Sequence, residues 1–278
     1  MKYILYNSLA NNKKGENTAH SYVEKITEKY ELKDVVKLDY QSFVNSLTEN
    51  DEVTIVGGDG TINRFINEIG DYQPVCNVYL VPAGTGNDFY HDVTDGKEET
   101  RVLLNPYLNN LPTVFVNGIT KKFINGVGFG IDGYCCEVGD ELKEKSDKPI
   151  NYTGIAIKGL LFHFKPVKAK VIVDGVTEEF TKVWLTPTMK GRFYGGGMMV
   201  APNQNRKGTT VSTVVYRTGS KLKALMVFPS IFKGEHIKKE KMVKVFTGKE
   251  ITVEFDRPTA LQIDGETVKN VTTYTVRA

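Results

Sequence analysis

The stretch that decides the fold is Asp51-Glu-Val-Thr-Ile-Val-Gly-Gly-Asp-Gly-Thr-Ile-Asn-Arg-Phe-Ile-Asn-Glu-Ile69. A β-branched run leads into the glycine-rich segment Gly57–Thr61, and the apolar residues that follow have the i, i+3, i+4, i+7 spacing of a helix with one buried face. The pattern predicts a strand, a glycine turn and a helix. Free N–H groups and the positive end of the helix dipole at such a turn can hold an anion, and glycines let it approach closely.

Asp59 is the unusual residue of this turn, because a carboxylate repels a phosphate bound beside it. In a poorly solvated pocket the repulsion is large unless a cation lies between the two groups. The residue therefore indicates Mg²⁺ and a nucleoside triphosphate. The alternative that the segment leaves open is a Gly-Asp-Gly turn that only caps the helix.

The composition is that of an ordinary globular protein of one or two domains, with 278 residues, 40% hydrophobic and 25% charged. A formal net charge of +3 and the lack of a basic stripe with interleaved aromatics argue against nucleic acid as a partner. Three cysteines, two of them adjacent, give neither a disulfide framework nor a zinc spacing, which favours a reducing cytoplasm. We expect no signal peptide and no transmembrane segment, so any membrane contact should be peripheral.

The pattern of hydrophobic and polar residues changes near residue 112. Before about residue 90, strand and helix patterns alternate, which predicts a parallel sheet covered by helices. After residue 113, period-two alternation with Asp-Gly turns at 174–175 and 264–265 predicts antiparallel β structure. We therefore expect an α/β domain over residues 1–112, to which the last few residues of the chain could return, and a β domain over residues 113–278.

A second glycine loop, Val81–Phe89, follows the fourth strand of the first domain. Loops at the carboxyl ends of neighbouring parallel strands converge on one crevice, where ligands bind. Thr85 and Asn87 could contact phosphate or ribose there, and Asp88 could orient a cation or a lysine. The alternative is a turn with an Asx cap.

The late segment Gln262-Ile-Asp-Gly-Glu-Thr267 places two carboxylates around a glycine at the end of an alternating strand. Such a pair could supply a general base, although an ordinary hairpin turn is the alternative. The glycine-rich segments 125–133 and 194–197 lack the strand-then-helix setting of a dinucleotide site, so we expect tight β turns or a close backbone approach there. The lysines of 233–244 lie near Phe232, as in a surface that contacts anionic lipid, but a solvated face is the simpler interpretation.

Taken together, these segments resemble the diacylglycerol kinase catalytic-domain family, in particular its small soluble bacterial lipid kinases. The resemblance spans nearly the whole chain and is carried by the order and spacing of Gly57–Thr61, Pro82–Phe89, Phe123–Asp132, Gly195–Pro202 and Gln262–Glu266.

The resemblance implies a three-layer α/β N-terminal domain like that of phosphofructokinases and NAD kinases, a C-terminal antiparallel β-sandwich that helps form the lipid site, and an active site in the cleft between them. It implies Glu266 as proton acceptor and Asp264 as its close partner. Lys13 and Lys14 would lie beside the nucleotide phosphates, and Asp59 would reach the Mg²⁺ of Mg-ATP. The nucleotide-binding positions would be Asn7, Gly57, Gly58, Asp59, Gly60, Thr61, Asn63, Gly84, Thr85, Asn87 and Asp88.

Two departures from the family pattern bear on activity. Lys207 stands where the family has an aspartate that anchors a structural Mg²⁺, and we hypothesise that its ammonium replaces the charge of that ion. Arg64 stands where glutamate is common.

The sequence thus predicts a cytoplasmic, ATP- and Mg²⁺-dependent kinase that phosphorylates a lipid hydroxyl at the membrane surface. Diacylglycerol is the expected acceptor, with phosphatidic acid as product. The alternatives are a kinase for a sphingoid base, another glycerolipid or a polyol, and a catalytically weak regulator that binds nucleotide or lipid. A homodimer is left open.

Overall fold

The computed structural model describes residues 1–10, 15–145 and 150–278, so Lys13 and Lys14 lie outside the described residues. The chain forms two compact units, Met1–Leu111 and Pro112–Ala278.

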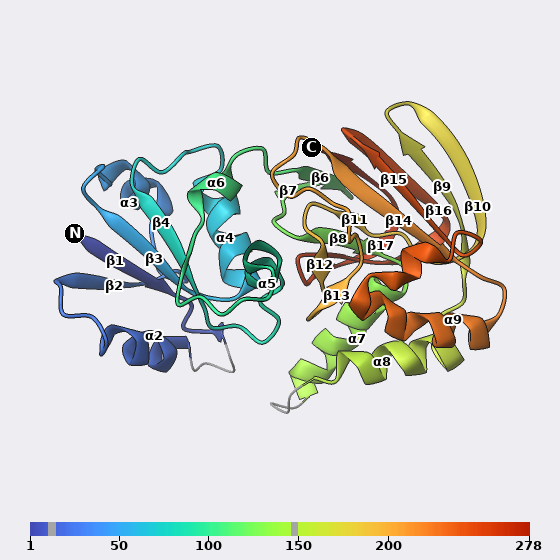
Figure 1. Ribbon diagram of the computed structural model, residues 1–278, viewed down its shortest axis with the longest axis horizontal. Helices are drawn as coiled ribbons and strands as arrows, with labels where there is room; N and C mark the ends of the chain where they lie inside the picture. The colour runs from blue at the N-terminus through green and yellow to red at the C-terminus, as the bar shows by residue number, and fades with distance from the viewer. Residues whose placement is uncertain (11–14, 146–149) are drawn as a thin grey trace. The chain divides into compact units, whose positions relative to one another are not determined.

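The first unit is built around a five-stranded sheet in the order β2-β1-β3-β4-β5. The first four of these strands are parallel, and β5 is antiparallel to β4 (Figure 1). The elements in chain order are β1 (Lys2–Tyr6), α2 (Gly15–Val23), β2 (Tyr30–Asp34), α3 (Tyr40–Ser46), β3 (Glu52–Gly57), α4 (Asp59–Ile69), β4 (Asn77–Pro82), α5 (Asp88–Thr94), β5 (Val102–Leu103) and α6 (Asn105–Leu108).

The strand-turn-helix predicted from Asp51 onward is β3 followed by α4. Ile62, Phe65 and Ile66 are almost completely buried on the inner face of α4, as the helical spacing requires. Gly57 at the end of β3 pairs with Pro82 at the end of β4. The two glycine loops therefore leave the sheet side by side, at the edge where parallel sheets bind ligands.

The second unit contains a ten-stranded antiparallel sheet, with the main order β7-β6-β17-β16-β8-β11-β14-β10-β9 and β15 paired to β14. Its elements are β6 (Thr113–Val116), β7 (Ile119–Lys122), β8 (Gly126–Phe129), α7 (Ile131–Lys145), α8 (Tyr152–Lys158), η1 (Gly159–His163), β9 (Val167–Val173), β10 (Val176–Leu185), β11 (Thr188–Met189), β12 (Phe193–Tyr194), β13 (Met198–Met199), β14 (Val211–Arg217), α9 (Lys221–Val227), η2 (Phe228–Lys233), η3 (Glu235–Lys238), β15 (Val243–Gly248), β16 (Glu250–Ile263) and β17 (Glu266–Arg277).

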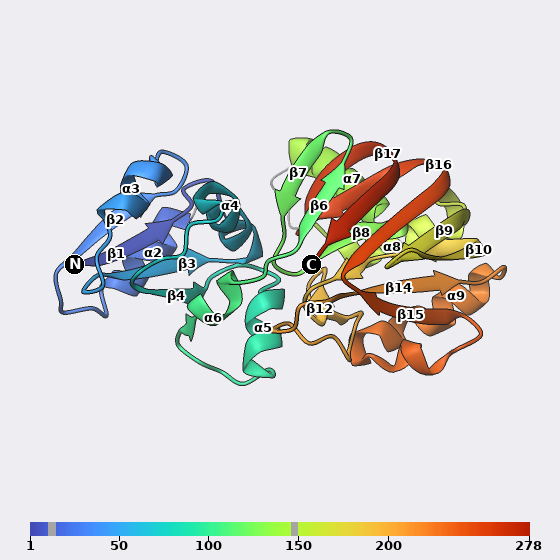
Figure 2. The same cartoon turned by 90° about the horizontal axis from the view of Figure 1, so that it is seen from above.

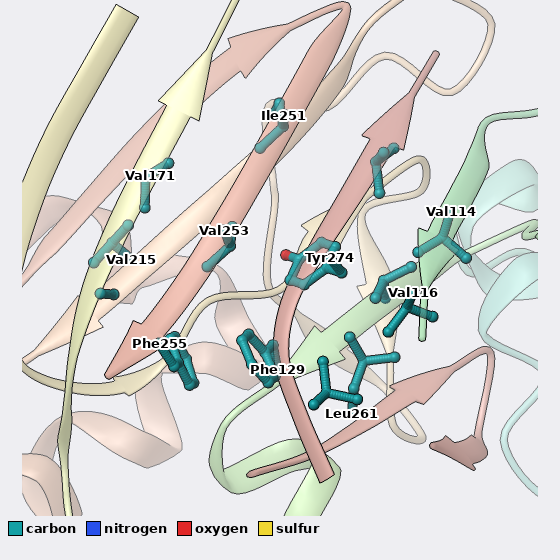
Figure 3. Packing of buried hydrophobic residues seen from close by; sticks show 14 of the residues in the cluster. Val114, Val116, Phe129, Val171, Val215, Ile251, Val253, Phe255, Leu261 and Tyr274 are labelled. Carbon is teal, nitrogen blue, oxygen red and sulfur yellow. The ribbon is translucent and has the colours of Figure 1, made fainter. Parts of the chain in front are cut away.

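Strand β16 closes this sheet on itself. Its first half pairs with β9 and its last three residues pair with β8. Its register against β17 breaks between Glu254 and Thr259, which lets one long strand change neighbours. Phe129 stacks on Phe255 at a ring-centroid distance of 3.8 Å and meets Tyr274 edge to face, so aromatic rings fill the space enclosed by the sheet (Figure 3).

The predicted fold class is confirmed: an α/β unit precedes an antiparallel β unit. The last residues of the chain, whose return to the first unit was left open, lie in the second unit. There β17 lies beside β16 (Figure 2), and Arg277 pairs with Thr113 of β6, so the backbone of the chain end already has its partners. Among the described residues, no helix is long and apolar enough to span a membrane.

Candidate active site

A cavity of about 250 Å³ lies at the carboxyl ends of β3 and β4 in the first unit. Its lining includes eight of the residues predicted to bind nucleotide, which come from β1 and from both glycine loops. These eight are Asn7, Gly57, Gly58, Asp59, Gly60, Thr61, Gly84 and Thr85. The N-terminus of α4 opens into this cavity with Gly58 as a cap that offers no side-chain hydrogen bond. The Thr61 amide donates to the carbonyl of Gly58 at 3.0 Å, and the positive end of the helix dipole at this N-terminus favours an anion.

The two glycine loops touch each other at Gly58 and Gly84. A Cβ atom on Gly58 would lie 2.8 Å from the Cα atom of Gly84, and one on Gly84 would lie 2.7 Å from the Cα atom of Gly58. Neither position has room for a side chain. A Cβ atom on Gly60, by contrast, would meet no heavy atom within 4 Å. Protein packing therefore explains the glycines at 58 and 84, and the space beside Gly60 belongs to the cavity.

Asp59 joins the two loops by capping helix α5. Its carboxylate oxygens accept hydrogen bonds from the backbone amides of Asp88 and Phe89, each at 2.9 Å. A carboxylate at a helix N-terminus satisfies amides that the helix leaves without partners and faces the positive end of the dipole. The carboxylate thus has a structural task in addition to the metal contact expected of it.

Three of the predicted binding residues support the site from outside. Among the described residues that line the cavity, Asn63, Asn87 and Asp88 are absent. Asn87 has a left-handed backbone, and its side chain bonds both the N–H and the C=O of Gly84, which fixes the second loop. Asp88 is buried, and Asn63 is buried within α4. That these three residues help to bind the nucleotide stays a prediction.

The metal expectation can be tested against the donor atoms present. In the described part of the chain, no group of three or more His, Cys, Asp or Glu side chains could hold an ion by itself. The cavity supplies one carboxylate, Asp59, beside a site suited to phosphate. That set fits an Mg²⁺ ion held by one carboxylate and by the phosphates that it accompanies, which is the usual arrangement for this ion.

In the second unit, the Asp-Gly-Glu segment forms the hairpin between β16 and β17. Asp264 and Gly265 both have positive φ angles, 46° and 94°, as a two-residue type I′ turn requires. The Asp264 carboxylate accepts from the amides of Ile124, Asn125 and Gly126, at 2.6, 2.9 and 3.0 Å. The turn is therefore held against the segment that leads into β8 and against the first residue of that strand.

Glu266 projects from the first position of β17. Its side chain is 62% exposed and forms an ion pair with Lys121 of β7. The carboxylate of Asp264 accepts hydrogen bonds from backbone amides, so this side chain fixes the position of the turn. Of the two carboxylates in the motif, Glu266 is the one that a substrate hydroxyl can approach.

Two buried cations, Lys190 and Arg206, lie beside this turn, and neither is among the predicted site residues. The Arg206 guanidinium donates to the carbonyl of Ile124 and, at 2.8 Å, to Oδ1 of Asn125. Lys190 Nζ donates to the carbonyl of Gly208 at 2.7 Å. Burial, and then the charge of Arg206, lowers the pKa of Lys190 to about 8. Only their three-dimensional neighbours distinguish these residues from surface lysines and arginines.

The two departures from the family pattern have distinct surroundings. Lys207 is exposed. The ammonium group that donates a hydrogen bond to the turn around it, at the carbonyl of Gly208, belongs to Lys190. The hypothesis that the Lys207 ammonium replaces the charge of the structural Mg²⁺ stays a prediction. Arg64 pairs with Glu68 on α4 at 3.8 Å and is not among the described residues that line the cavity.

A buried carboxyl, Asp132, lies at the start of α7 in the glycine-rich segment 125–133. The hydroxyl of Tyr194 donates to its Oδ2 at 3.0 Å, and the amide of Gly133 donates to its Oδ1 at 3.1 Å. Burial raises the pKa of Asp132 to about 6, against an ordinary value of 3.8. Gly195, Gly196 and Gly197 all have positive φ, as tight turns require. Gly133 shows the close backbone approach instead, because a Cβ atom there would lie 2.0 Å from the carbonyl oxygen of Ala260, and segment 125–133 also contains the start of a helix.

Comparison with known proteins covers both units. Residues 2–112 match the family model described as diacylglycerol kinase catalytic domain, and residues 125–277 match the YegS C-terminal NAD kinase beta sandwich-like domain. A diacylglycerol kinase of Mycobacterium tuberculosis H37Rv is 24% identical over 215 residues, covering 75% of this chain and 67% of the relative. The Bacillus subtilis protein named "Putative lipid kinase YtlR" is 26% identical over 232 residues, covering 76% and 72%.

Solved structures extend the fold match to almost the full length. A crystal structure of a diacylglycerol kinase from Bacillus anthracis str. Sterne superposes with a TM-score of 0.64 at 17% identity, covering 99% of this chain and 93% of that chain. This likeness concerns the fold alone.

Proposed function

Because the chain belongs to the diacylglycerol kinase catalytic-domain family and is a lipid kinase, we propose that it transfers the γ-phosphoryl group of ATP to the free hydroxyl of diacylglycerol, producing phosphatidic acid. The observation that carries the proposal is the cavity framed by the two glycine loops, which meet at Gly58 and Gly84. A cavity with helix amides at its base and open space beside Gly60 suits the phosphates of a nucleotide.

In this proposal, the nucleotide phosphates bind the first amides of α4 and the hydroxyls of Thr61 and Thr85, which line the cavity. Mg²⁺ that enters with the nucleotide would lie beside Asp59 and neutralise charge on the phosphoryl oxygens. Asn87 and Asp59 hold the second loop in place through its backbone. These contacts preorganise donors around the charge that develops during transfer.

Glu266 is our candidate for the group that accepts the proton of the lipid hydroxyl as this hydroxyl attacks the γ-phosphorus. The exposed carboxylate can come within hydrogen-bond reach of a substrate, which a general base requires. Asp264 would serve as a positioning residue, because its three amide contacts fix the turn from which Glu266 projects. Lys121 orients the Glu266 carboxylate by pairing with it.

The choice of acceptor is the part of the proposal that needs an experiment. Purified protein would be incubated with γ-labelled ATP, Mg²⁺ and separate acceptors: diacylglycerol, monoacylglycerol, a sphingoid base and glycerol. We expect label in phosphatidic acid. Label in the sphingoid base or in glycerol, and none in phosphatidic acid, would show that diacylglycerol is not the acceptor. No labelled product from any acceptor, with Mg-ATP still raising the melting temperature, would mean a protein that binds nucleotide without transferring phosphate.

A further inference from the structure

An apolar surface on the second unit has no role in the proposed chemistry. Phe162 of η1 is 73% exposed, and Leu222 and Met226 of α9 are 67% and 64% exposed. Side chains of this size gain free energy when they leave water, so a group of them marks a contact surface. We call these three residues, with the lysines that flank them, the η1–α9 surface. The lysines are Lys158, Lys165, Lys221, Lys223 and Lys233.

The two elements are in contact, so the exposed residues form one surface. Lys221 Nζ at the start of α9 donates to the carbonyl of Leu161 in η1 at 2.6 Å. The opposite sides of both elements are buried in the same hydrophobic cluster, through Leu160 in η1 and Ala224 and Val227 in α9. Figure 1 shows α8, which continues into η1, next to α9 along one side of the unit. The outer sides of η1 and α9 therefore face the same solvent region.

Helix α9 has apolar residues on two sides. Ala224 and Val227, three positions apart, pack into the core, whereas Leu222 and Met226, four positions apart, face outward. A surface helix normally has a polar outer face. An apolar outer face flanked by Lys221 and Lys223 is typical of helices that lie in the interface of a bilayer.

The two segments that form this surface carry charges of one sign. Segments 150–168 and 218–234 each contain three lysines and no aspartate or glutamate, whereas the whole chain has a net charge of only +3. The neighbouring helix α7 carries most of its acidic residues in its second half, and Glu137, which shares a pocket with His163 and Lys165, pairs with Lys269 at 3.7 Å. That half lies at the start of α8, where Lys143 Nζ is 6.0 Å from the ring centroid of Tyr152. The end of α8 meets the first half of α7, through Gly159 and Tyr134.

We propose that the η1–α9 surface docks on an anionic lipid bilayer, with Phe162, Leu222 and Met226 inserted among the acyl chains and the lysines against the headgroups. Charge complementarity selects this partner, because anionic headgroups attract clustered lysines. A second copy of the chain would bring two positively charged faces together. The inference extends the proposed function, because a kinase whose acceptor resides in a bilayer must reach it, but docking needs neither nucleotide nor transfer.

The first test is co-flotation with vesicles in the absence of nucleotide. We expect binding to phosphatidylcholine vesicles that contain phosphatidylglycerol, little binding to pure phosphatidylcholine, and weaker binding at high salt. The double variant Leu222→Ser/Met226→Ser and the single variant Phe162→Ser should each bind at least tenfold more weakly. Val176→Ser is the matched control, because Val176 is also 73% exposed but lies at the start of β10.

The electrostatic part is tested by Lys221→Gln/Lys223→Gln, with Lys25→Gln/Lys29→Gln as a control of equal charge change. Only the first pair should reduce binding to the anionic vesicles. Undiminished binding of the surface variants would overturn the proposal. It would also be overturned if light scattering showed a wild-type dimer that the Leu222→Ser/Met226→Ser variant breaks, because the surface would then join two copies.

A kinase assay separates docking from transfer. With a short-chain diacylglycerol dissolved as monomers, the surface variants should match the wild type, whereas with diacylglycerol in anionic vesicles they should be slower by about the loss in vesicle binding. Equal losses on both substrates would contradict a docking role. Vesicle binding by a protein that phosphorylates no lipid would leave the docking surface intact and remove the proposed function.

Discussion

Gly58 and Gly84 lie so close together that a methyl group on Gly58 would be 2.8 Å from the Cα atom of Gly84. The first residue ends the turn after β3 and the second lies in the loop after β4, so this contact joins the two loops that frame the phosphate cavity. Asp59 reinforces the junction from the side by accepting two amides of α5. The site is therefore a single rigid unit built from two glycine loops.

Alanine at positions 58 and 60 should have opposite effects. Gly58→Ala forces the loops apart and should lower the free energy of unfolding by about 1–3 kcal/mol, as overpacking does. Gly60→Ala meets no protein atom and places a better helix former in α4, so stability should stay equal or rise by up to about 1 kcal/mol. Because Gly60 lines the cavity, its methyl group should crowd the phosphates and reduce the thermal shift caused by Mg-ATP. Wild-type nucleotide affinity in Gly60→Ala would show that the phosphates bind elsewhere.

The capping role of Asp59 predicts a graded loss of stability in the protein without nucleotide. Asp59→Ala leaves the amides of Asp88 and Phe89 without their acceptor and should cost about 1–3 kcal/mol. Asp59→Asn keeps one acceptor oxygen and should cost less. Denaturant unfolding of the three proteins in EDTA measures this order. Identical unfolding midpoints would mean that Asp59 serves the ligand alone.

The three amide contacts of Asp264 predict that substitutions at this position lower the stability of the second unit. Asp264→Asn can keep the left-handed backbone of the turn and one acceptor oxygen, so it should cost about 1–2 kcal/mol. Asp264→Ala loses all three amide contacts and meets strain at positive φ, so it should cost more than the asparagine. If both variants unfold like the wild type but lose transfer, Asp264 takes part in the chemistry itself.

Asp132 predicts a pH-dependent stability. Its carboxyl holds a proton up to about pH 6 in the folded chain but loses it near the ordinary value of 3.8 when unfolded. Between these values the unfolded state binds fewer protons, so this group makes stability fall as pH rises from about 4 to 6. Asp132→Asn should remove that slope and stabilise the protein at pH 7.5 by up to roughly 3 kcal/mol. Thermal melts at pH 4.5 and 7.5 measure the difference, with the exposed Glu98→Gln as control. An equal effect at both pH values would contradict a buried, protonated carboxyl.

Much of the fold was predictable because local pattern and tertiary packing agree. The strand-turn-helix from Asp51 to Ile69 has the periodicity of its final burial, and the Asp264-Gly265 turn is the dipeptide that its positive φ angles require. Helix α7 was missed, because Asp132 and Gly133 at its start read as turn residues. Burial of that start, where Gly133 packs on the backbone of Ala260, decides the conformation there.

The site was predictable in composition but less so in roles. Sequence order placed Asp59, Asn87 and Asp264 within three motifs, yet each uses its side chain on backbone groups of the protein. The sequence alone does not distinguish an aspartate that caps a helix from one that contacts a ligand. Lys190 and Arg206 had no local signal at all, since only the fold makes them neighbours.

The measurement that tests the central claim most directly is the transfer of label from γ-labelled ATP to diacylglycerol by the wild type and by Glu266→Gln. The side chain is 62% exposed, so the variant should fold and bind Mg-ATP normally. The account predicts labelled phosphatidic acid from the wild type and at least about a hundredfold slower transfer by the variant, the range in which general bases act. Equal rates in the two proteins, or no labelled lipid from the wild type, would contradict it.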